Sequence, residues 1–306
     1  MKEIKSVGII GRGAIGSLYG SLFMKNQFPS YYFIVDPIRK EKYEHTPFFV
    51  NGEAIAFPYV EKGHTFDLIM ITTKFSGLAS ALRQIRPFVG DETILLSCLN
   101  GISSETICRE LYPQDQVIRC IVQGMDATYL ENEMHYTKVG EILFGAENDT
   151  QLDALHALET FFSSQHIPYR ICNDILREQW NKLMLNCGIN QVCARYVCGY
   201  GPCQSNGAHQ QEFIRAMEEV KLVANAQGIA LTQEDIEQWI RLVDSLAADS
   251  MPSMAQDILA KRKTELALFS GTILPLARHH QLSVPTLQTL YTEISKREEE
   301  FETLGS

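Results

Sequence analysis

Hydrophobic residues in the first half of the chain fall into short runs, and amphipathic stretches separate most of them. Short apolar runs that end at turn signals predict buried strands, whereas apolar residues three or four positions apart predict helices. The predicted strands cover residues 4–10, 31–35, 66–72, 93–97, 117–122, 134–138, 142–144 and 168–172. The predicted helices between them cover residues 14–25, 76–85, 104–111 and 150–164. Strands that alternate with helices predict a mostly parallel, doubly wound sheet.

The pattern changes near residue 170, and the second half of the chain has helical spacing throughout. The predicted helices there cover residues 174–197, 208–227, 232–247, 252–280 and 284–301. Pro252, Pro275 and Pro285 mark helix starts or kinks. We therefore predict two domains, an α/β domain over residues 1–172 and an all-α domain over residues 173–306.

A glycine-rich loop joins the first predicted strand to the first predicted helix. Its six residues form a G-x-G-x-x-G motif and are Gly11, Arg12, Gly13, Ala14, Ile15 and Gly16. In this motif the first glycine permits a tight turn, the second lets the backbone approach a pyrophosphate, and the third permits close packing of the helix on the strand. The N-terminus of the helix adds N–H groups and a positive dipole. The strand–loop–helix order predicts a Rossmann domain that binds a dinucleotide, which we take to be a nicotinamide coenzyme; the alternative is a glycine-rich turn without a ligand.

Polar residues follow the predicted strands at the edge of the sheet where ligands bind. Asp36 follows Gly16 by 20 residues, where a carboxylate accepts hydrogen bonds from the adenosine ribose and disfavours a 2′-phosphate. Arg39 and Lys40 follow closely and would hold such a phosphate, unless they form only a solvated loop. Thr73–Lys74 and Asn100–Gly101 each stand just after a predicted strand and are further candidates for ligand contact.

Three polar residues interrupt the apolar helix predicted at residues 174–197. Lys182, Asn186 and Asn190 recur at intervals of four, and four helical steps turn the side chain by only ~40°, so the three form one narrow stripe. A lysine and two asparagines on a buried helix are costly without partners. The alternative is that the stripe faces water, with Glu178 paired to Lys182 four residues later.

Two further polar residues stand in the segment predicted as helix 252–280. Ser253 directly follows Pro252 at a helix start, so capping is its simplest role. Glu265 follows a short basic run, so a surface ion pair is its simplest role.

Taken together, these motifs resemble the ketopantoate reductase (2-dehydropantoate 2-reductase) family over nearly the whole chain. The matching motifs are G-x-G-A-I-G at 11–16, T-K at 73–74, N-G at 100–101, W-x-K-x3-N-C-x-I-N at 180–190, P-S-M-x-Q-D at 252–257 and T-E at 264–265. The resemblance implies a Rossmann domain followed by a helical domain of the 6-phosphogluconate-dehydrogenase type. It also implies an NADPH-dependent reduction of ketopantoate to pantoate, on the route to pantothenate and coenzyme A.

The resemblance implies a role for each candidate residue. Lys182 would be the general acid that protonates the developing alkoxide, and Glu265 would orient Lys182 or contact the coenzyme ribose. Lys74 would lie near the adenosine end of the coenzyme. The implied substrate contacts are Asn100, which also touches the coenzyme, Asn186, Asn190 and Ser253.

The chain departs from the family pattern at several positions, which are Asp36, Leu99, Tyr200, Ala267 and Ser270. These departures leave open a paralogous reductase that acts on another branched 2-oxo acid. A non-catalytic dinucleotide-binding sensor is the third reading, but it would need neither Lys182 nor Glu265. For the coenzyme, the family indicates NADPH and Asp36 indicates NADH; we expect NADPH.

Composition narrows the classes of partner. The formal net charge of −10 gives no basic footprint for a nucleic acid. No run approaches the ~20 apolar residues that span a bilayer, and the apolar stretch at residues 7–10 is too short for a signal peptide. We expect a cytoplasmic enzyme with a small-molecule substrate and no membrane partner. The sequence does not define the oligomeric state and is compatible with a homodimer.

The eight cysteines give no zinc signature. None of them forms a C-x2-C pair, and no histidine stands at zinc-like spacing from them. We therefore expect free thiols and no bound metal.

Overall fold

The computed structural model describes residues 2–304, which divide into two compact units. The first unit joins Met1–Asn100 with Ser104–Ile175, and the second joins Gly101–Ser103 with Leu176–Ser306. The division does not fall at one point in the sequence, because the short segment Gly101–Ser103 packs with the second unit. The Ser103 hydroxyl, for example, lies 3.2 Å from the Thr272 hydroxyl.

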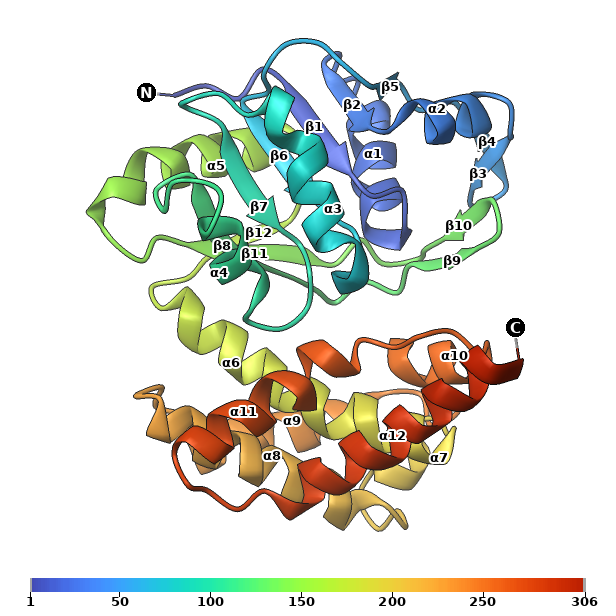
Figure 1. Ribbon diagram of the computed structural model, residues 1–306, viewed down its shortest axis with the longest axis vertical. Coiled ribbons are helices and arrows are strands. Elements are labelled where there is room, and N and C mark those ends of the chain that lie inside the picture. The colour runs from blue at the N-terminus through green and yellow to red at the C-terminus, as the bar shows by residue number, and fades with distance from the viewer. Residues whose placement is uncertain (1, 305–306) are drawn as a thin grey trace. The chain divides into compact units, whose positions relative to one another are not determined.

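The first unit is built on a twisted sheet that is mostly parallel (Figure 1). Among the described residues its strands run in the order β12 (Tyr169–Ile171), β11 (Glu141–Gly145), β8 (Val117–Gln123), β7 (Ile94–Ser97), β6 (Leu68–Ile71), β1 (Val7–Ile10), β2 (Tyr31–Ile34) and β5 (Tyr59–Val60). The strands from β8 to β5 are parallel, and β11 pairs antiparallel with β8. The predicted doubly wound, mostly parallel sheet is confirmed.

Helices cover both faces of this sheet, which explains why its central strands β1 and β6 carry no polar side chain. Alternate residues of β1 and β6 enter two different cores. Val7 and Leu68 pack in the core that contains helices α1 (Ala14–Lys25) and α5 (Leu152–Ser164). Ile10 and Ile69 pack in the core that contains α3 (Phe75–Ile85) and α4 (Ser104–Arg109).

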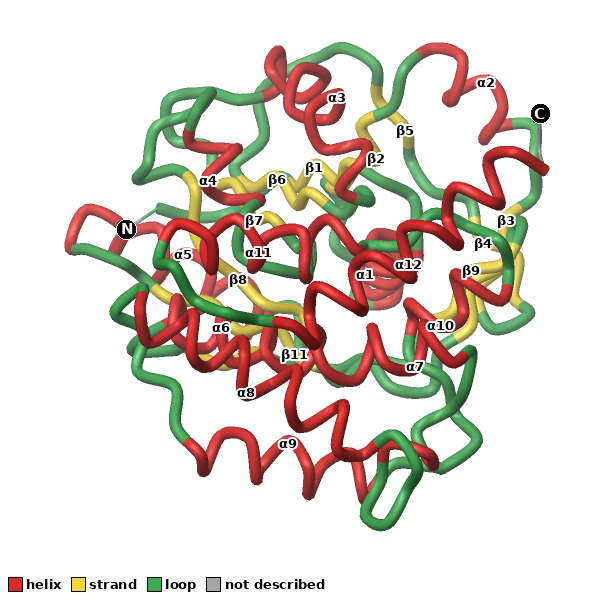
Figure 2. The backbone as a smooth tube through the Cα atoms, turned by 60° about the horizontal axis from the view of Figure 1, so that its bottom comes forward, coloured by secondary structure: helices red, strands yellow, loops and turns green. Residues whose placement is uncertain are grey.

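A second, smaller sheet accompanies the first and was not predicted. Its strands are β4 (Glu53–Ile55), β3 (Phe48–Val50), β10 (Glu133–His135) and β9 (Thr128–Leu130), in that order. Figure 2 labels β3, β4 and β9 of this sheet. The predicted strand at 134–138 was wrong in extent, because pairing stops at His135, and its residues join this sheet instead of the main one. In the β9–β10 turn, Glu131 takes the left-handed conformation. Glycine usually marks such a turn in a sequence, and its absence here is why the hairpin was not predicted.

The second unit is helical, as predicted, apart from its connecting loops. Its helices are α6 (Ile175–Leu185), a π-helical turn (Asn186–Asn190), α7 (Gln191–Tyr196), α8 (Gln210–Ala226), α9 (Gln233–Ser245), α10 (Ser253–Leu259), α11 (Ser270–His279) and α12 (Pro285–Leu304). Along residues 2–304, no helix has both the length and the apolar character needed to cross a membrane.

The continuous helix predicted over residues 252–280 was wrong, because the structure breaks it between α10 and α11. Lys261 takes a left-handed conformation with φ 53°. Arg262 then donates its backbone N–H to the Asp257 carbonyl and its Nε to the Asp257 carboxylate, both at 2.8 Å. The backbone N–H of Thr264 binds the Glu298 carboxylate of α12 at 2.7 Å. These contacts hold the connecting loop against neighbouring elements and end the helix.

A partly buried ion pair joins the first and the third long helices of the second unit. Arg177 of α6 donates Nη2 to both carboxylate oxygens of Asp235, at 2.9 and 2.7 Å. Asp235 also closes the capping box at the start of α9, where it accepts the Thr232 backbone N–H at 2.7 Å. Burial raises the pKa of the Asp235 carboxyl, but the bonds from Arg177 and Thr232 outweigh burial and hold that pKa below its ordinary value of 3.8.

We predict that Asp235→Asn lowers the free energy of unfolding at pH 7 by about 1–3 kcal/mol, because it removes a charge-assisted pair and a cap. Because the folded-state pKa is depressed, the contribution of Asp235 is complete above pH ~4 and disappears as the pH falls through that pKa.

Urea unfolding between pH 2 and 7 tests both points: wild type should lose stability on acidification, and the variant should lose less. The matched control is Glu234→Gln, which removes an exposed charge next to Asp235 and should change stability much less than Asp235→Asn. Equal losses in the two variants would contradict this account.

Candidate functional site

The glycine loop lies where the strand order of the main sheet reverses. It follows β1, which has β2 on one side and β6 on the other. Ligands of open α/β sheets bind at such a switch point, beyond the carboxyl ends of the strands. Gly11 has φ +110°, and a Cβ there would lie 2.7 Å from the carbonyl carbon of Thr72. The Thr72 hydroxyl donates to the Gly11 carbonyl at 2.7 Å, which fixes the loop to the end of β6.

The other two glycines of the loop have opposite surroundings. A Cβ at Gly16 would overlap the Gly11 carbonyl oxygen and lie 2.6 Å from the Thr72 hydroxyl, so α1 packs against the loop as only glycine allows. A Cβ at Gly13 would meet no atom within 4 Å. Gly13 is the N-cap of α1 and supplies no side-chain cap, and Ala14 and Ile15 begin the helix. The loop therefore presents uncapped N–H groups to open space, a geometry that fits a pyrophosphate.

Arg12, the remaining loop residue, is buried, with 8% of its surface exposed. Its guanidinium lies 3.5 Å from the centre of the Tyr43 ring and 4.7 Å from that of Phe48. Its Nη1 donates to the Tyr59 hydroxyl at 2.8 Å. Burial raises the pKa of Tyr59, and Arg12 offsets part of this increase.

Asp36 lies at the end of β2, as predicted, and begins a helix that was not predicted. It is the N-cap of α2 (Pro37–Glu44) and accepts the Arg39 backbone N–H at 2.7 Å. The Arg39 guanidinium lies 3.3 Å from the same carboxylate, and Lys40 lies 4.0 Å from Glu61. An aspartate followed by proline is a helix-start signal that would have located α2.

The other expected coenzyme contacts follow the next two strands. Lys74 is exposed and is the N-cap residue of α3. Asn100 is half-buried and precedes Gly101, which has φ +88°. Thr73, which we did not single out from its neighbour Lys74, has a buried hydroxyl without a hydrogen-bond partner among the described residues.

The polar stripe of the second unit is largely buried. Lys182 is half-buried in α6, while Asn186 and Asn190 are 6% and 8% exposed in the π-helical turn. The water-facing alternative is therefore wrong for the two asparagines. Asn190 donates Nδ2 to the Asn186 side-chain oxygen at 3.0 Å. The Asn186 Nδ2 is itself buried and has no partner among the described residues.

Two polar residues of α6 differ from Asn186, because their side chains bond to a neighbouring helix of the fold. The Asn181 side-chain oxygen accepts the Trp239 Nε1 at 2.7 Å, and Arg177 holds Asp235. The Asn186 amide differs from both of these groups because its Nδ2 has no partner among the described residues. A π-helical turn within an α-helix often marks a functional position.

Ser253 lies on a helix beside this stripe, and Glu265 lies in the loop that follows that helix. Ser253 is exposed, is the first residue of α10, and makes no capping bond, since Pro252 is the N-cap. Helix α10 packs against α7 and against the π-helical turn. Glu265 is half-buried at the end of the loop between α10 and α11.

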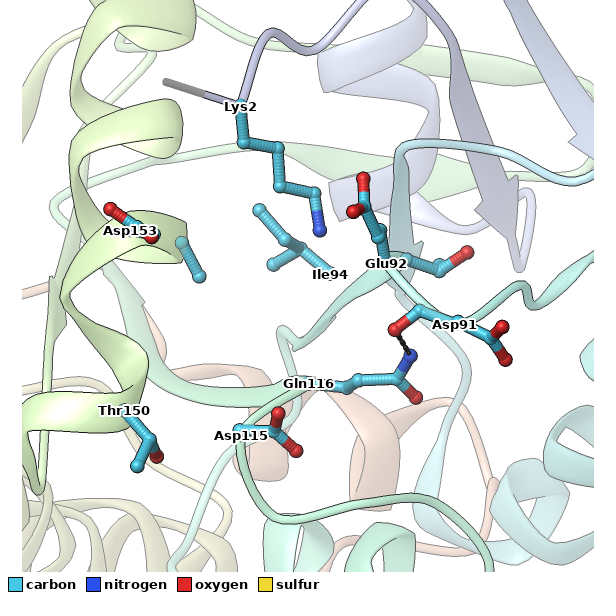
Figure 3. A pocket seen from close by; sticks show the side chains of 10 residues that line it. Lys2, Asp91, Glu92, Ile94, Asp115, Gln116, Thr150 and Asp153 are labelled. Carbon is cyan, nitrogen blue, oxygen red and sulfur yellow. Dashed lines mark hydrogen bonds between the residues drawn. The ribbon is translucent and has the colours of Figure 1, made fainter.

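A separate cavity of about 450 Å³ lies in the first unit (Figure 3). It lies at the amino ends of β7 and β8, and its polar lining includes Lys2, Asp91, Glu92, Asp115, Gln116 and Asp153. Gln116 donates its side-chain amide to the Asp91 carbonyl at 2.6 Å. Burial lowers the pKa of the Lys2 ammonium, and nearby carboxylates partly offset this. None of the residues expected to bind coenzyme or substrate lines this cavity.

The cysteines within residues 2–304 are free thiols. The closest recorded approach between two of them joins Cys193 and Cys203, whose sulfur atoms lie 3.8 Å apart. In the same part of the chain, no three or more His, Cys, Asp or Glu side chains have the geometry of a metal site.

The two glycine environments give a paired prediction. Gly13→Ala should fold with an unchanged Tm, because φ −93° and the open space accept a Cβ, but it should weaken dinucleotide binding at least ~10-fold by blocking the phosphates. Gly16→Ala should instead lower the Tm, because its Cβ overlaps the loop. Calorimetric melting and coenzyme titration of both variants test this. A stable Gly13→Ala protein that binds coenzyme like wild type would contradict the assignment of the loop.

Comparison with known proteins identifies relatives of both units. The family model described as ketopantoate reductase PanE/ApbA matches residues 7–149, and its C-terminal counterpart matches residues 174–298. The 2-dehydropantoate 2-reductase of Shigella flexneri is 34% identical over 134 residues, which cover 44% of this chain and 43% of that protein.

Solved structures share the fold over nearly the whole chain. A D-mandelate dehydrogenase with NADH and anilino(oxo)acetate superimposes with a TM-score of 0.86 at 21% identity, covering 97% of this chain and 99% of the other. A PanE/ApbA family ketopantoate reductase from Ralstonia eutropha JMP134 gives a TM-score of 0.82 at 21% identity, with the same coverage. With both halves matched by its models and its architecture shared with these structures, the chain belongs to the ketopantoate reductase (PanE/ApbA) family of oxidoreductases.

Proposed function

We propose that this oxidoreductase reduces ketopantoate (2-dehydropantoate) to pantoate with NADPH, in the synthesis of pantothenate and coenzyme A. The observation that carries the proposal is the buried Asn186 amide, whose Nδ2 has no partner within the described chain. An unsatisfied buried donor costs about 1–3 kcal/mol, and an acceptor on a ligand relieves that cost. A 2-oxo acid brings such acceptors in its carboxylate, its ketone and, for ketopantoate, its hydroxyl.

The first unit supplies the coenzyme site in this proposal. Gly11, Gly13 and Gly16 shape the loop, and the uncapped start of α1 at Ala14 and Ile15 faces the phosphates. Arg12, Asp36, Lys74 and Asn100 complete the coenzyme contacts. When bound, the reduced nicotinamide supplies the hydride that the ketone carbon accepts.

The second unit supplies the acid and the substrate contacts. Lys182 protonates the ketone oxygen as negative charge develops there, and its ammonium stabilises that charge before the proton moves. Glu265 orients Lys182 or contacts the coenzyme ribose. The substrate contacts in this unit are Asn186, Asn190 and Ser253. Since Asn190 already donates to Asn186, the pair is held in one orientation, with the Asn186 Nδ2 directed to the substrate.

A paralogous reductase of another 2-oxo acid is the second candidate. It is supported by the departures at Ala267, Ser270 and Tyr200 and by the likeness to a D-mandelate dehydrogenase bound to anilino(oxo)acetate. Ser270 is fully buried, and its hydroxyl is another group without a partner among the described residues.

Substrate specificity separates the two candidates. We expect kcat/KM with NADPH to be highest for ketopantoate in a panel that also contains 2-oxoisovalerate, 2-oxoisocaproate and phenylglyoxylate. Oxidation of the coenzyme, followed at 340 nm, measures this ratio. If an aromatic or a simple branched 2-oxo acid is reduced faster, the paralogous reductase is correct and ketopantoate is wrong.

The role of Asn186 gives a matched pair of variants. Asn186→Ala should raise the KM for the 2-oxo acid by on the order of 10-fold, because a donor to the substrate is lost, and should leave the Kd of the coenzyme unchanged. Asn181→Ala, one turn earlier, removes the bond to Trp239 and should lower the Tm without raising this KM. Steady-state kinetics and thermal melting distinguish the two. The same change in KM in both variants would show that Asn186 acts through the fold.

A further inference from the structure

Arg12 is a buried cation whose recorded partners are all uncharged. Its surface is 8% exposed, and the rings of Tyr43 and Phe48 cover its guanidinium. The Tyr59 hydroxyl takes one N–H group, Nη1. The Nε group is buried and has no hydrogen-bond partner among the described residues.

These contacts leave the charge of Arg12 uncompensated. Aromatic rings stabilise a cation less than a paired carboxylate does, and a tyrosine hydroxyl satisfies only one of five N–H donors. Buried charges in proteins are normally paired with an opposite charge. Nearby exposed cations have such partners, since Arg39 pairs with Asp36 and Lys40 with Glu61. The guanidinium of Arg12 is therefore built to meet an anion from outside the described chain.

The position of the guanidinium indicates which anion this is. Its partners come from α2 (Tyr43), β3 (Phe48) and β5 (Tyr59), and β5 pairs with β2. Arg12 thus reaches from the glycine loop toward the carboxyl end of β2, where a Rossmann domain holds the adenosine ribose. The rings of Tyr43 and Phe48 lie against the guanidinium, so it meets a ligand with its edge, in the geometry that binds phosphate oxygens.

Asp36, at the same end of β2, is the residue that argues for NADH. Its carboxylate, however, accepts the Arg39 backbone N–H at 2.7 Å and lies 3.3 Å from the Arg39 guanidinium. The start of α2 and Arg39 therefore already offset its charge.

We propose that Arg12 selects NADPH over NADH by binding the 2′-phosphate of the adenosine ribose. The rings of Tyr43 and Phe48 hold the side chain in place, and the part of the guanidinium that these contacts leave open faces the phosphate. This inference rests on the proposed nicotinamide coenzyme but not on the identity of the 2-oxo acid.

Two fragments that differ only in the phosphate provide the test. Isothermal titration of the full-length protein with 2′-phospho-ADP-ribose and with ADP-ribose measures the discrimination without any turnover. Wild type should bind the phosphorylated fragment about 10- to 100-fold more tightly. If wild type binds the two fragments equally, or binds ADP-ribose more tightly, the proposal is wrong, and no variant is needed to show it.

Variants then assign the discrimination to a residue. Arg12→Met keeps much of the packing, removes the charge, and should bring the affinity for 2′-phospho-ADP-ribose down to that for ADP-ribose, with the latter unchanged. Arg12→Lys keeps the charge and should retain part of the discrimination, which tests the proposal even if the methionine variant does not fold. The matched control is Arg39→Met, which removes an exposed cation and should change the ratio less than about 3-fold.

Three results would assign Arg12 another role. An equal loss for both fragments in Arg12→Met would place Arg12 at the pyrophosphate or in the structure of the loop. An unchanged ratio in Arg12→Met would remove it from the site, and loss of discrimination in Arg39→Met alone would assign the phosphate to Arg39. A failure of ketopantoate turnover would leave these titrations unaffected, so the two proposals fail separately.

Discussion

The coenzyme half of the structure depends on the close approach of helix α1 to the ends of β1 and β6. Any side chain at Gly16 would overlap the Gly11 carbonyl, and the Thr72 hydroxyl holds that carbonyl in place with a hydrogen bond. This contact fixes where α1 begins, and hence where its uncapped N–H groups point. The contact between Gly16 and the Gly11 carbonyl also sets the position of the residues between them. Gly13 is left in open surroundings, and the Arg12 side chain extends toward β2.

The second unit follows a complementary rule, that buried polar groups are satisfied unless a ligand is meant to satisfy them. Arg177 is held by Asp235, and Asn181 by Trp239. Asn186, on the same run of helix, has a side-chain N–H group with no partner among the described residues. In the first unit, the Arg12 guanidinium is a buried charge whose Nε also has no partner among the described residues. We assign both groups to ligands because each is a buried donor without a hydrogen-bond partner among the described residues.

The sequence predicted the central sheet and the long helices because their buried positions recur with the spacing of strands and helices. Strands such as β6 are apolar at every position since both faces are covered. Helix α2 has no buried residue and so gave no amphipathic pattern, and the strands of the small sheet are only three residues long. The glycine loop and the stripe at Lys182 could also be found from spacing. The surroundings of Arg12 could not, because Tyr43, Phe48 and Tyr59 reach it only through tertiary packing.

The central claim is that a hydride acceptor binds beside Lys182 and receives its proton from that residue. Transfer of deuterium from coenzyme labelled at the nicotinamide C4 tests this most directly, with mass spectrometry of the product from wild type and from Lys182→Met. Wild type should convert ketopantoate to pantoate that carries deuterium on the former ketone carbon. Lys182→Met should bind coenzyme normally and form labelled product at least ~100-fold more slowly. Unlabelled product from wild type, or labelling at the wild-type rate in the variant, would contradict the account.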